Sequence, residues 1–176
     1  MPDFTRGVAA FSYKGETAGV VNRMKNGNRR LAAYLGEEMG EAVFPFLQEG
    51  EEVLLVPIPL TENRKKERGY NQAELLAEAV QRRLYVCGVE STLDVELLQK
   101  RRETALQKQK TRKERVENIQ GAYHVHKRKA CEGKTIVLID DIITTGATGS
   151  ECARLLLNAK AKRVIFLVAA ALPEQK

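Results

Sequence analysis

Residues 136–148 read IVLIDDIITTGAT, and this stretch decides both the fold and the chemistry that we expect of the chain. The apolar run over 135–139 is short and partly β-branched, which predicts a strand buried inside a parallel sheet. Asp140 and Asp141 follow at the carboxyl end of that strand. Because charge is costly at the end of a buried strand unless it is paired or used, the two carboxylates indicate a functional site.

A turn of small and hydroxyl-bearing residues follows the carboxylates and precedes a helix predicted over 148–160. The turn reads Thr144-Thr145-Gly146-Ala147-Thr148. Backbone N–H groups at a helix start lack intrahelical partners, and the helix dipole and threonine hydroxyls add to their attraction for phosphate. With carboxylates nearby to hold sugar hydroxyls or a metal ion, the stretch predicts a sugar-phosphate site. The alternative, in which Thr148 simply caps the helix, leaves the paired carboxylates unexplained.

Apolar patterns on either side of this stretch predict an α/β fold. Buried strands are expected over 53–58 and 162–171, a short strand over 11–13, and helices after Thr17, over 29–44 and over 71–84. Strands that alternate with helices form a parallel sheet, and ligands bind beyond the carboxyl ends of its strands. The loops expected to carry function are therefore 57–72 and 140–148.

The composition excludes several classes of protein. Hydrophobic residues make up 43% of the 176 residues and charged residues 30%, which is typical of a globular chain with a core. No apolar run approaches the roughly 18 residues of a membrane span, and the first 25 residues do not read as a signal peptide. Cys87, Cys131 and Cys152 are widely spaced and odd in number, so we expect neither a disulfide framework nor a cysteine-rich zinc site. A cytoplasmic location is the default expectation.

The net charge of +6 is concentrated in one segment. Residues 99–129 contain eleven Lys or Arg and three Glu, a local charge of +8, so the rest of the chain sums to −2. Such a segment indicates a polyanionic partner, either a phosphorylated small molecule or nucleic acid. The alternative is a solvated lysine-rich loop that aids solubility. Residues 99–117 are nearly free of large apolar side chains, which predicts a mobile loop or an exposed basic helix.

These motifs together resemble a known family. The stretch 136–148 is similar to the motif by which type I phosphoribosyltransferases bind 5-phosphoribosyl 1-pyrophosphate (PRPP). Residues 68–73, RGYNQA, resemble the RGxNQ segment of ComF-type (competence protein F-like) phosphoribosyltransferase domains. The segment 56–59 and the R-x-T-x-x-Q pattern of Arg102, Thr104 and Gln107 also fit. The resemblance spans about residues 11–173. It implies one domain with a type I phosphoribosyltransferase fold and a small N-terminal hood over about residues 1–28.

The resemblance also implies a role for each motif. Asp140 and Asp141 would hold the 2- and 3-hydroxyls of the ribose with Mg2+ nearby, and residues 144–148 would wrap the 5-phosphate. The pyrophosphate loop would comprise Pro57, Ile58, Pro59, Arg68 and Gly69, and the family motif would continue with Tyr70, Asn71 and Gln72. Residues 99–117 would form a lid with Lys100, Arg101 and Arg102 at its entrance, which places cations near a diphosphate leaving group.

The sequence departs from the family in two respects. ComF-type proteins usually begin with a cysteine-rich zinc ribbon, whereas this chain starts about where that segment would end, as a shortened member or a trimmed product would. Zinc is therefore not expected, and we interpret His124, His126 and Cys131 as structural residues, because no fourth ligand lies near them in the sequence. Thr144 stands where the 6-oxopurine enzymes carry an Asp, which disfavours hypoxanthine or guanine as the acceptor.

Two functions remain open on these grounds. The first is an enzyme that transfers phosphoribose from PRPP to an unidentified acceptor and releases pyrophosphate. The second is a non-catalytic accessory protein of natural competence that binds PRPP or single-stranded DNA through the basic segment. Further expected partners are proteins of the competence machinery and a second copy of the chain.

Overall fold

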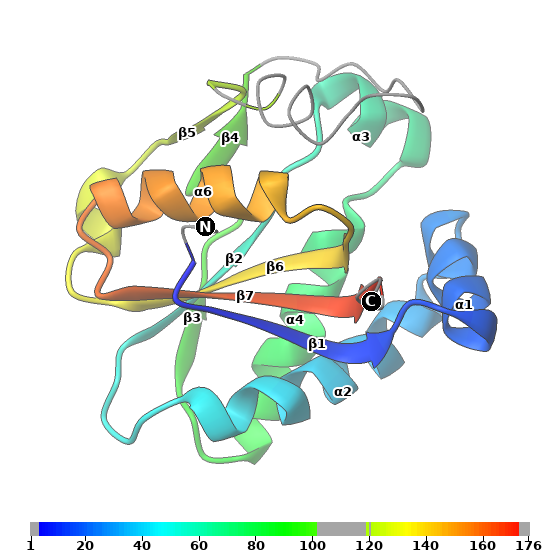
Figure 1. The fold of residues 1–176 in the computed structure, drawn as a ribbon, viewed down its shortest axis with the longest axis horizontal. Coiled ribbons are helices and arrows are strands. Elements are labelled where there is room, and N and C mark those ends of the chain that lie inside the picture. The colour runs from blue at the N-terminus through cyan, green and yellow to red at the C-terminus, as the bar shows by residue number, and fades with distance from the viewer. Residues whose placement is uncertain (1–3, 102–118, 120, 173–176) are drawn as a thin grey trace.

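A parallel sheet forms the centre of the molecule (Figure 1). The computed structural model describes residues 4–101, 119 and 121–172. Within these residues the main sheet has five strands in the order β1 (Arg6–Ser12), β7 (Arg163–Ala171), β6 (Thr135–Ile143), β2 (Val53–Pro57) and β3 (Ser91–Leu93). Every neighbouring pair is parallel, so the α/β fold predicted from the sequence is confirmed.

Helices cover both faces of this sheet. Figure 1 shows α2 (Arg30–Val43) and α4 (Gln72–Val86) on one face, α6 (Ala147–Asn158) on the other, and α1 (Gly15–Lys25) beside the carboxyl ends of β1 and β7. The remaining elements are η1 (Phe44–Phe46), α3 (Glu62–Arg68), η2 (Arg128–Cys131) and an antiparallel pair, β4 (Leu98–Lys100) and β5 (Tyr123–Val125). Within the residues described, no helix combines the length and apolar character needed to span a bilayer.

The side chains of β6 alternate between two cores. Val137 and Ile139 pack with α2 and α4, whereas Ile136 and Leu138 pack on the face that α6 covers. Successive residues of a strand point to opposite faces, and this strand is covered on both, so a continuous apolar run is required. The same alternation sends Asp141 toward the side of α4 and Asp140 toward the side of α6.

Strand β6 is longer than the sequence indicates. It was expected to end at Ile139, but it continues through both aspartates to Ile143. The partner strand β7 is equally long and pairs with it as far as Ile143 opposite Ala171, whereas β2 ends at Pro57 opposite Ile139. The carboxylates therefore lie on the part of β6 that has lost its neighbour on one side.

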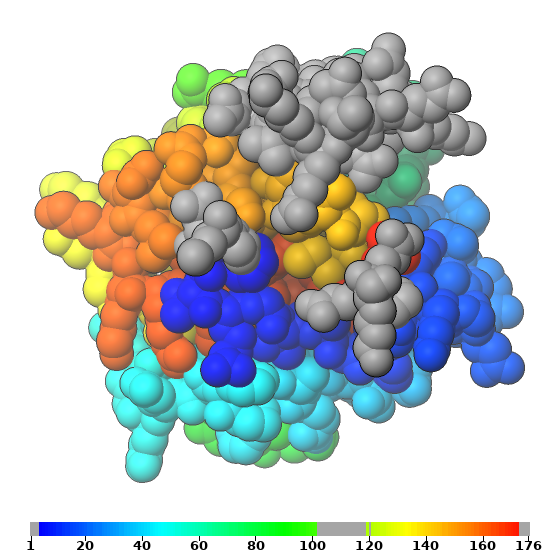
Figure 2. Space-filling model, viewed as in Figure 1, coloured from blue at the N-terminus to red at the C-terminus, as the bar shows by residue number. Residues whose placement is uncertain are grey.

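Four further elements differ from the expectations. Strand β4 covers the first residues of the segment 99–117, which was predicted as a mobile loop or an exposed basic helix. Residues 61–68, predicted as a loop, contain helix α3, which ends at Gly69 with φ of +74°. The first strand begins at Arg6 rather than near residue 11, and its outer edge lies on the molecular surface in Figure 2. The short edge strand β3 was not expected. The first 28 residues thus contribute β1 and α1 to the main architecture.

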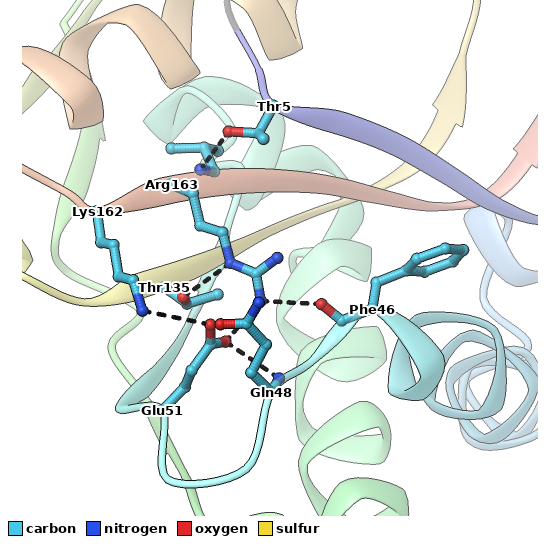
Figure 3. A network of polar contacts seen from close by, with 8 residues as sticks. Thr5, Phe46, Gln48, Glu51, Thr135, Lys162 and Arg163 are labelled. Atoms are coloured by element: carbon cyan, nitrogen blue, oxygen red, sulfur yellow. Dashed lines mark hydrogen bonds and ion pairs between the residues drawn. The ribbon is translucent and has the colours of Figure 1, made fainter.

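The amino end of the sheet is held by a partly buried ion pair (Figure 3). Arg163, the first residue of β7, donates to Glu51 Oε2 at 2.6 Å, to Thr135 Oγ1 at 3.1 Å and to the carbonyl of Phe46 at 2.9 Å. Burial raises the pKa of Glu51, but the hydrogen bonds from Arg163, Gln48 N and Thr135 together with the charge of Arg163 outweigh it and leave that pKa below its ordinary value. The network ties the segment between η1 and β2 to the end of the sheet opposite the carboxylates.

Helices α2 and α4 cross closely because glycine occupies two turns of α2. A Cβ on Gly36 would lie 2.4 Å from Ala79 Cβ and 2.8 Å from the carbonyl oxygen of Leu76. A Cβ on Gly40 would lie 2.7 Å from Arg83 Cβ. This contact positions α4, whose first residues reach the carboxyl end of the sheet.

We therefore predict that Gly36→Ala lowers the free energy of unfolding by about 1–3 kcal/mol, because the added methyl group overpacks the crossing. Gly19→Ala in α1 is the matched control, since nothing lies within 4 Å of its Cβ position. The control should gain about 0.5–1 kcal/mol from its better helix propensity. Urea denaturation of both variants measures the difference, and a stabilised Gly36→Ala variant would contradict the close crossing.

Candidate functional site

Two adjacent carboxylates lie where β2 ends. Asp141 is only 6% exposed, whereas Asp140 is partly exposed. The backbone N–H of Asp141 donates to Asp140 Oδ1 at 2.8 Å, which fixes the first carboxylate against the strand. The last hydrogen bond between the segment after β2 and strand β6 runs from Ile58 N to the Ile139 carbonyl at 2.8 Å. Beyond this bond the segment no longer pairs with β6, at the point where the two aspartates begin.

Asp141 is held by the ends of two helices. Lys25 Nζ, at the last residue of α1, lies 3.0 Å from Asp141 Oδ2. Gln72 Nε2, at the first residue of α4, donates to the same oxygen at 3.0 Å. The sequence leaves Lys25 open between a phosphate-facing and a solvent-facing position, because no local pattern reveals a contact between residues 116 positions apart.

Asp140 lies in an environment that disfavours its charge. Burial raises the pKa of Asp140 to about 8, and the charge of Asp141 acts in the same direction. The N–H of Asp141 and the charges of Lys25 and Lys100 oppose this shift without cancelling it. The environment of this carboxyl therefore favours its protonated form, and a bound cation would favour its ionised form.

The predicted phosphate turn connects β6 to α6. Gly146 takes the N-cap position with φ of +72°, a conformation that favours glycine, and Thr148 lies inside the helix instead of capping it. Thr145 Oγ1 accepts a hydrogen bond from Ala147 N at 3.5 Å. The turn and Asp140 line one small cavity of about 40 Å3. Asp140 and the turn therefore face a common space, whereas Asp141 does not line this cavity.

Gly149 lets the first turn of α6 rest directly on the sheet. A Cβ at this position would lie 2.2 Å from Phe166 Cε1 of β7. Phe166 in turn packs against Phe4, with ring centroids 5.4 Å apart. The first turn of α6, which follows the phosphate turn, therefore packs on the aromatic pair Phe166 and Phe4.

The motif Tyr70-Asn71-Gln72 joins three parts of the site. The Tyr70 hydroxyl donates to the carbonyl of Met24 and accepts from Gly27 N at 3.1 Å, while the Arg29 guanidinium lies 4.6 Å from the centre of its ring. Tyr70 therefore clamps the end of α1, directly beside Lys25.

Asn71 fixes the loop that follows β2. Its Oδ1 accepts from Ala73 N at 3.1 Å and caps α4, and its Nδ2 donates to the Ile58 carbonyl at 3.1 Å. Gln72 completes the motif through its contact with Asp141. The sequence marks these three residues as a motif, and the structure shows that each one holds a different segment in place.

The residues assigned to a pyrophosphate loop belong to separate elements. Pro57 ends β2 and Pro59 follows it, whereas Arg68 and Gly69 lie at the far end of α3. A cavity of about 620 Å3 is lined by Pro59, Leu60 and Lys65 and, from the other side, by Lys100, Arg101 and His124; its lining also includes Glu62, Glu74 and Glu96. The structure therefore brings the entrance of the predicted lid to the loop after β2. Residues 102–118, including Arg102, lie outside the described residues.

The part of the chain that the structure describes holds no group of three or more His, Cys, Asp or Glu side chains suited to a metal ion. His124, His126 and Cys131 are accordingly not gathered into a site.

We predict that Asp140→Asn raises the thermal stability of the chain at high pH. The carboxyl is neutral in the folded state up to about pH 8 but ionises near pH 4 when unfolded, so the free energy of unfolding falls as pH rises through that window. Asn does not titrate, so the melting temperature of the variant should match the parent near pH 4 and exceed it increasingly toward pH 8. Each kcal/mol corresponds to roughly 2–4 °C. Equal differences at pH 4.5 and pH 8.5 would contradict the raised pKa.

Comparison with known proteins gives a consistent picture. The phosphoribosyl transferase domain family matches residues 71–176. Competence protein ComFC of Bacillus subtilis is 40% identical over 105 residues, covering 60% of this chain and 38% of the relative. DNA utilization protein YhgH of Escherichia coli K12 is 33% identical over 110 residues, covering 62% and 45%. The chain thus spans less than half the length of these two relatives.

A solved hypoxanthine phosphoribosyltransferase from Staphylococcus aureus aligns with 82% of this chain and 74% of its own, at 15% identity and a TM-score of 0.49. The curated relatives confirm the resemblance to competence protein F-like proteins. The family match covers more than half of the chain and includes the motif residues Asn71 and Gln72, both aspartates and the phosphate turn, so the chain belongs to the phosphoribosyltransferase domain family.

Proposed function

We propose that the chain binds PRPP together with Mg2+ and transfers its phosphoribosyl group to an acceptor, with release of pyrophosphate. The observation that carries this proposal is the cavity shared by Asp140 and the turn 144–148 at the start of α6. Ribose hydroxyls need acceptors, and a 5-phosphate needs N–H and hydroxyl donors. The site supplies both on consecutive segments of the chain.

The described residues divide the work on the substrate. Asp140 and Asp141 accept hydrogen bonds from the ribose hydroxyls, and the backbone N–H groups around Gly146 donate to the 5-phosphate. Lys100 and Arg101 line the cavity beside the loop after β2, where the diphosphate is expected. Positioning of this kind brings the acceptor in line with C1 of the ribose.

In the transfer step the acceptor forms a bond to C1 with its lone pair, and the bond from C1 to the pyrophosphate oxygen breaks. Pyrophosphate leaves with the electron pair, so positive charge develops on the ribose and negative charge on the leaving group. Cations beside the diphosphate stabilise that negative charge. No side-chain nucleophile is required for this step.

The carboxylate pair fits Mg2+ in the form in which the ion meets phosphorylated substrates. Magnesium binds through one or two carboxylates plus substrate oxygens and water rather than through an all-protein cage. Asp140 and Asp141 would hold the ion with PRPP, and the ion would neutralise charge on the diphosphate. Two adjacent carboxylates at the edge of a ligand site agree with this arrangement.

We predict that Asp141→Asn weakens Mg·PRPP binding about tenfold or more, because an amide is a poorer hydrogen-bond acceptor for a hydroxyl than a carboxylate. Glu52→Gln is the control, since it removes the same charge from an exposed position at the amino end of the sheet. Calorimetric titration of PRPP with and without Mg2+ measures the effect. Unchanged affinity in Asp141→Asn, or equal losses in both variants, would exclude the assigned role.

A second function is supported by the names of the relatives and by the basic segment 99–129. One relative is described as a competence protein and the other as a DNA utilization protein. A local charge of +8 suits a phosphate backbone, and the alternative is therefore an accessory protein that binds PRPP without transfer, or single-stranded DNA.

If the segment binds single-stranded DNA, fluorescence anisotropy should show affinity falling with salt, with a log–log slope of about −0.7 for each contacted phosphate. Lys127→Gln and Lys129→Gln, two exposed positions of the segment, should each make the slope shallower by about that amount. Lys66→Gln, exposed on α3, should leave the slope unchanged. A salt-independent signal, or no binding at 50 mM salt, would exclude DNA as a partner of this segment.

A further inference from the structure

The contacts of Asp141 are concentrated on one of its two oxygens. Lys25 Nζ and Gln72 Nε2 both lie 3.0 Å from Oδ2. The contacts found among the described residues place no hydrogen bond on Oδ1. The side chains of Asp141 and Lys25 are 8% and 23% exposed, so this ion pair is largely shielded from water. A shielded, charge-assisted contact holds geometry more firmly than a surface pair does.

Lys25 is positioned by hydrogen bonds between Tyr70 and the backbone on either side of it. Tyr70 donates to the carbonyl of Met24 and accepts from Gly27 N, so its hydroxyl bridges the residues that flank Lys25. Arg29 covers the ring of Tyr70. The same short motif therefore places Gln72 and, through α1, Lys25 on the same carboxylate oxygen.

The charge of Lys25 also answers an electrostatic problem of the site. The negative charge of Asp141 repels a polyanionic ligand, and this carboxylate is too buried for water to screen it well. The ammonium group of Lys25, 3.0 Å from Oδ2, offsets the charge of Asp141, and Oδ1 keeps its capacity to accept a hydrogen bond.

We propose that Lys25 is a positioning residue for PRPP. With Gln72 it holds Oδ2 of Asp141, so that Oδ1 is directed to a ribose hydroxyl and the charge of the carboxylate is offset before the anion arrives. The inference rests on the proposed function, and it assigns to the N-terminal segment a share in substrate affinity that acts through Asp141. The opposite role, in which Lys25 blocks the site and competes with the ligand, predicts the reverse effect of its removal.

The test is calorimetric titration of Mg·PRPP into the full chain and three variants. Lys25→Met should weaken binding about tenfold or more, and Lys25→Arg should recover at least part of the loss because it restores the charge on Asp141. Arg23→Met is the matched control, since it removes one exposed positive charge from the same last turn of α1. It should stay within about twofold of the parent chain. Thermal denaturation shows whether the loss of affinity is merely structural. The melting temperatures of Lys25→Met and Lys25→Arg should differ little, so that their difference in affinity does not come from a loss of folded protein.

Each outcome decides between the two proposals. A parent chain that does not bind Mg·PRPP overturns the proposed function and this inference with it. A parent that binds, together with a Lys25→Met variant that binds equally well or more tightly, overturns the inference alone. A loss of the same size in Arg23→Met does so too, because it would reduce the effect to overall charge. If Lys25→Met does not fold, Lys25→Gln, which keeps a donor without the charge, replaces it with an expected loss of about threefold or more.

Discussion

The unequal length of two paired strands is the constraint on which the site depends. Strand β2 stops at Pro57, and because Pro59 has no N–H to donate, the chain cannot continue along β6. Strand β6 runs on beside β7 to Ile143. The stretch with a neighbour on only one side is the stretch that carries both aspartates. A longer β2 would fill the space beside them, and a shorter β7 would leave them on a loop without fixed direction.

The alternation of a strand then gives the two carboxylates different surroundings. Asp141 faces the ends of α1 and α4 and receives Lys25 and Gln72, whereas Asp140 shares a cavity with the phosphate turn and has a raised pKa. Adjacent in sequence, they are thus chemically unequal before any ligand arrives. The close crossing at Gly36 fixes the position of α4 on the sheet, and with it the position from which Gln72 contacts Asp141.

How much of this arrangement the sequence predicts depends on how local each signal is. The strand, turn and helix over 135–158 and the two covering helices follow from apolar periodicity and turn chemistry, and the structure agrees with them to within a few residues at most boundaries. Helix α3 was missed because its seven residues, ENRKKER, have no apolar face. The length of β6 depends on its pairing with β7, and the contact of Lys25 depends on a fold that brings residues 25 and 141 together. Neither feature has a signature in the local sequence.

The contact between Gly149 and Phe166 limits how the phosphate turn can vary. At this position any side chain beyond hydrogen would occupy the space of an aromatic ring, and the ring is itself packed against Phe4. Positions 144 and 145 meet no such barrier, since the first is exposed and the second partly so. Natural drift or directed evolution can therefore retune the chemistry of the turn through its side chains, while the path of its backbone is inherited almost unchanged. The side chains of the turn can vary, whereas the packing of Gly149 on Phe166 keeps its backbone fixed.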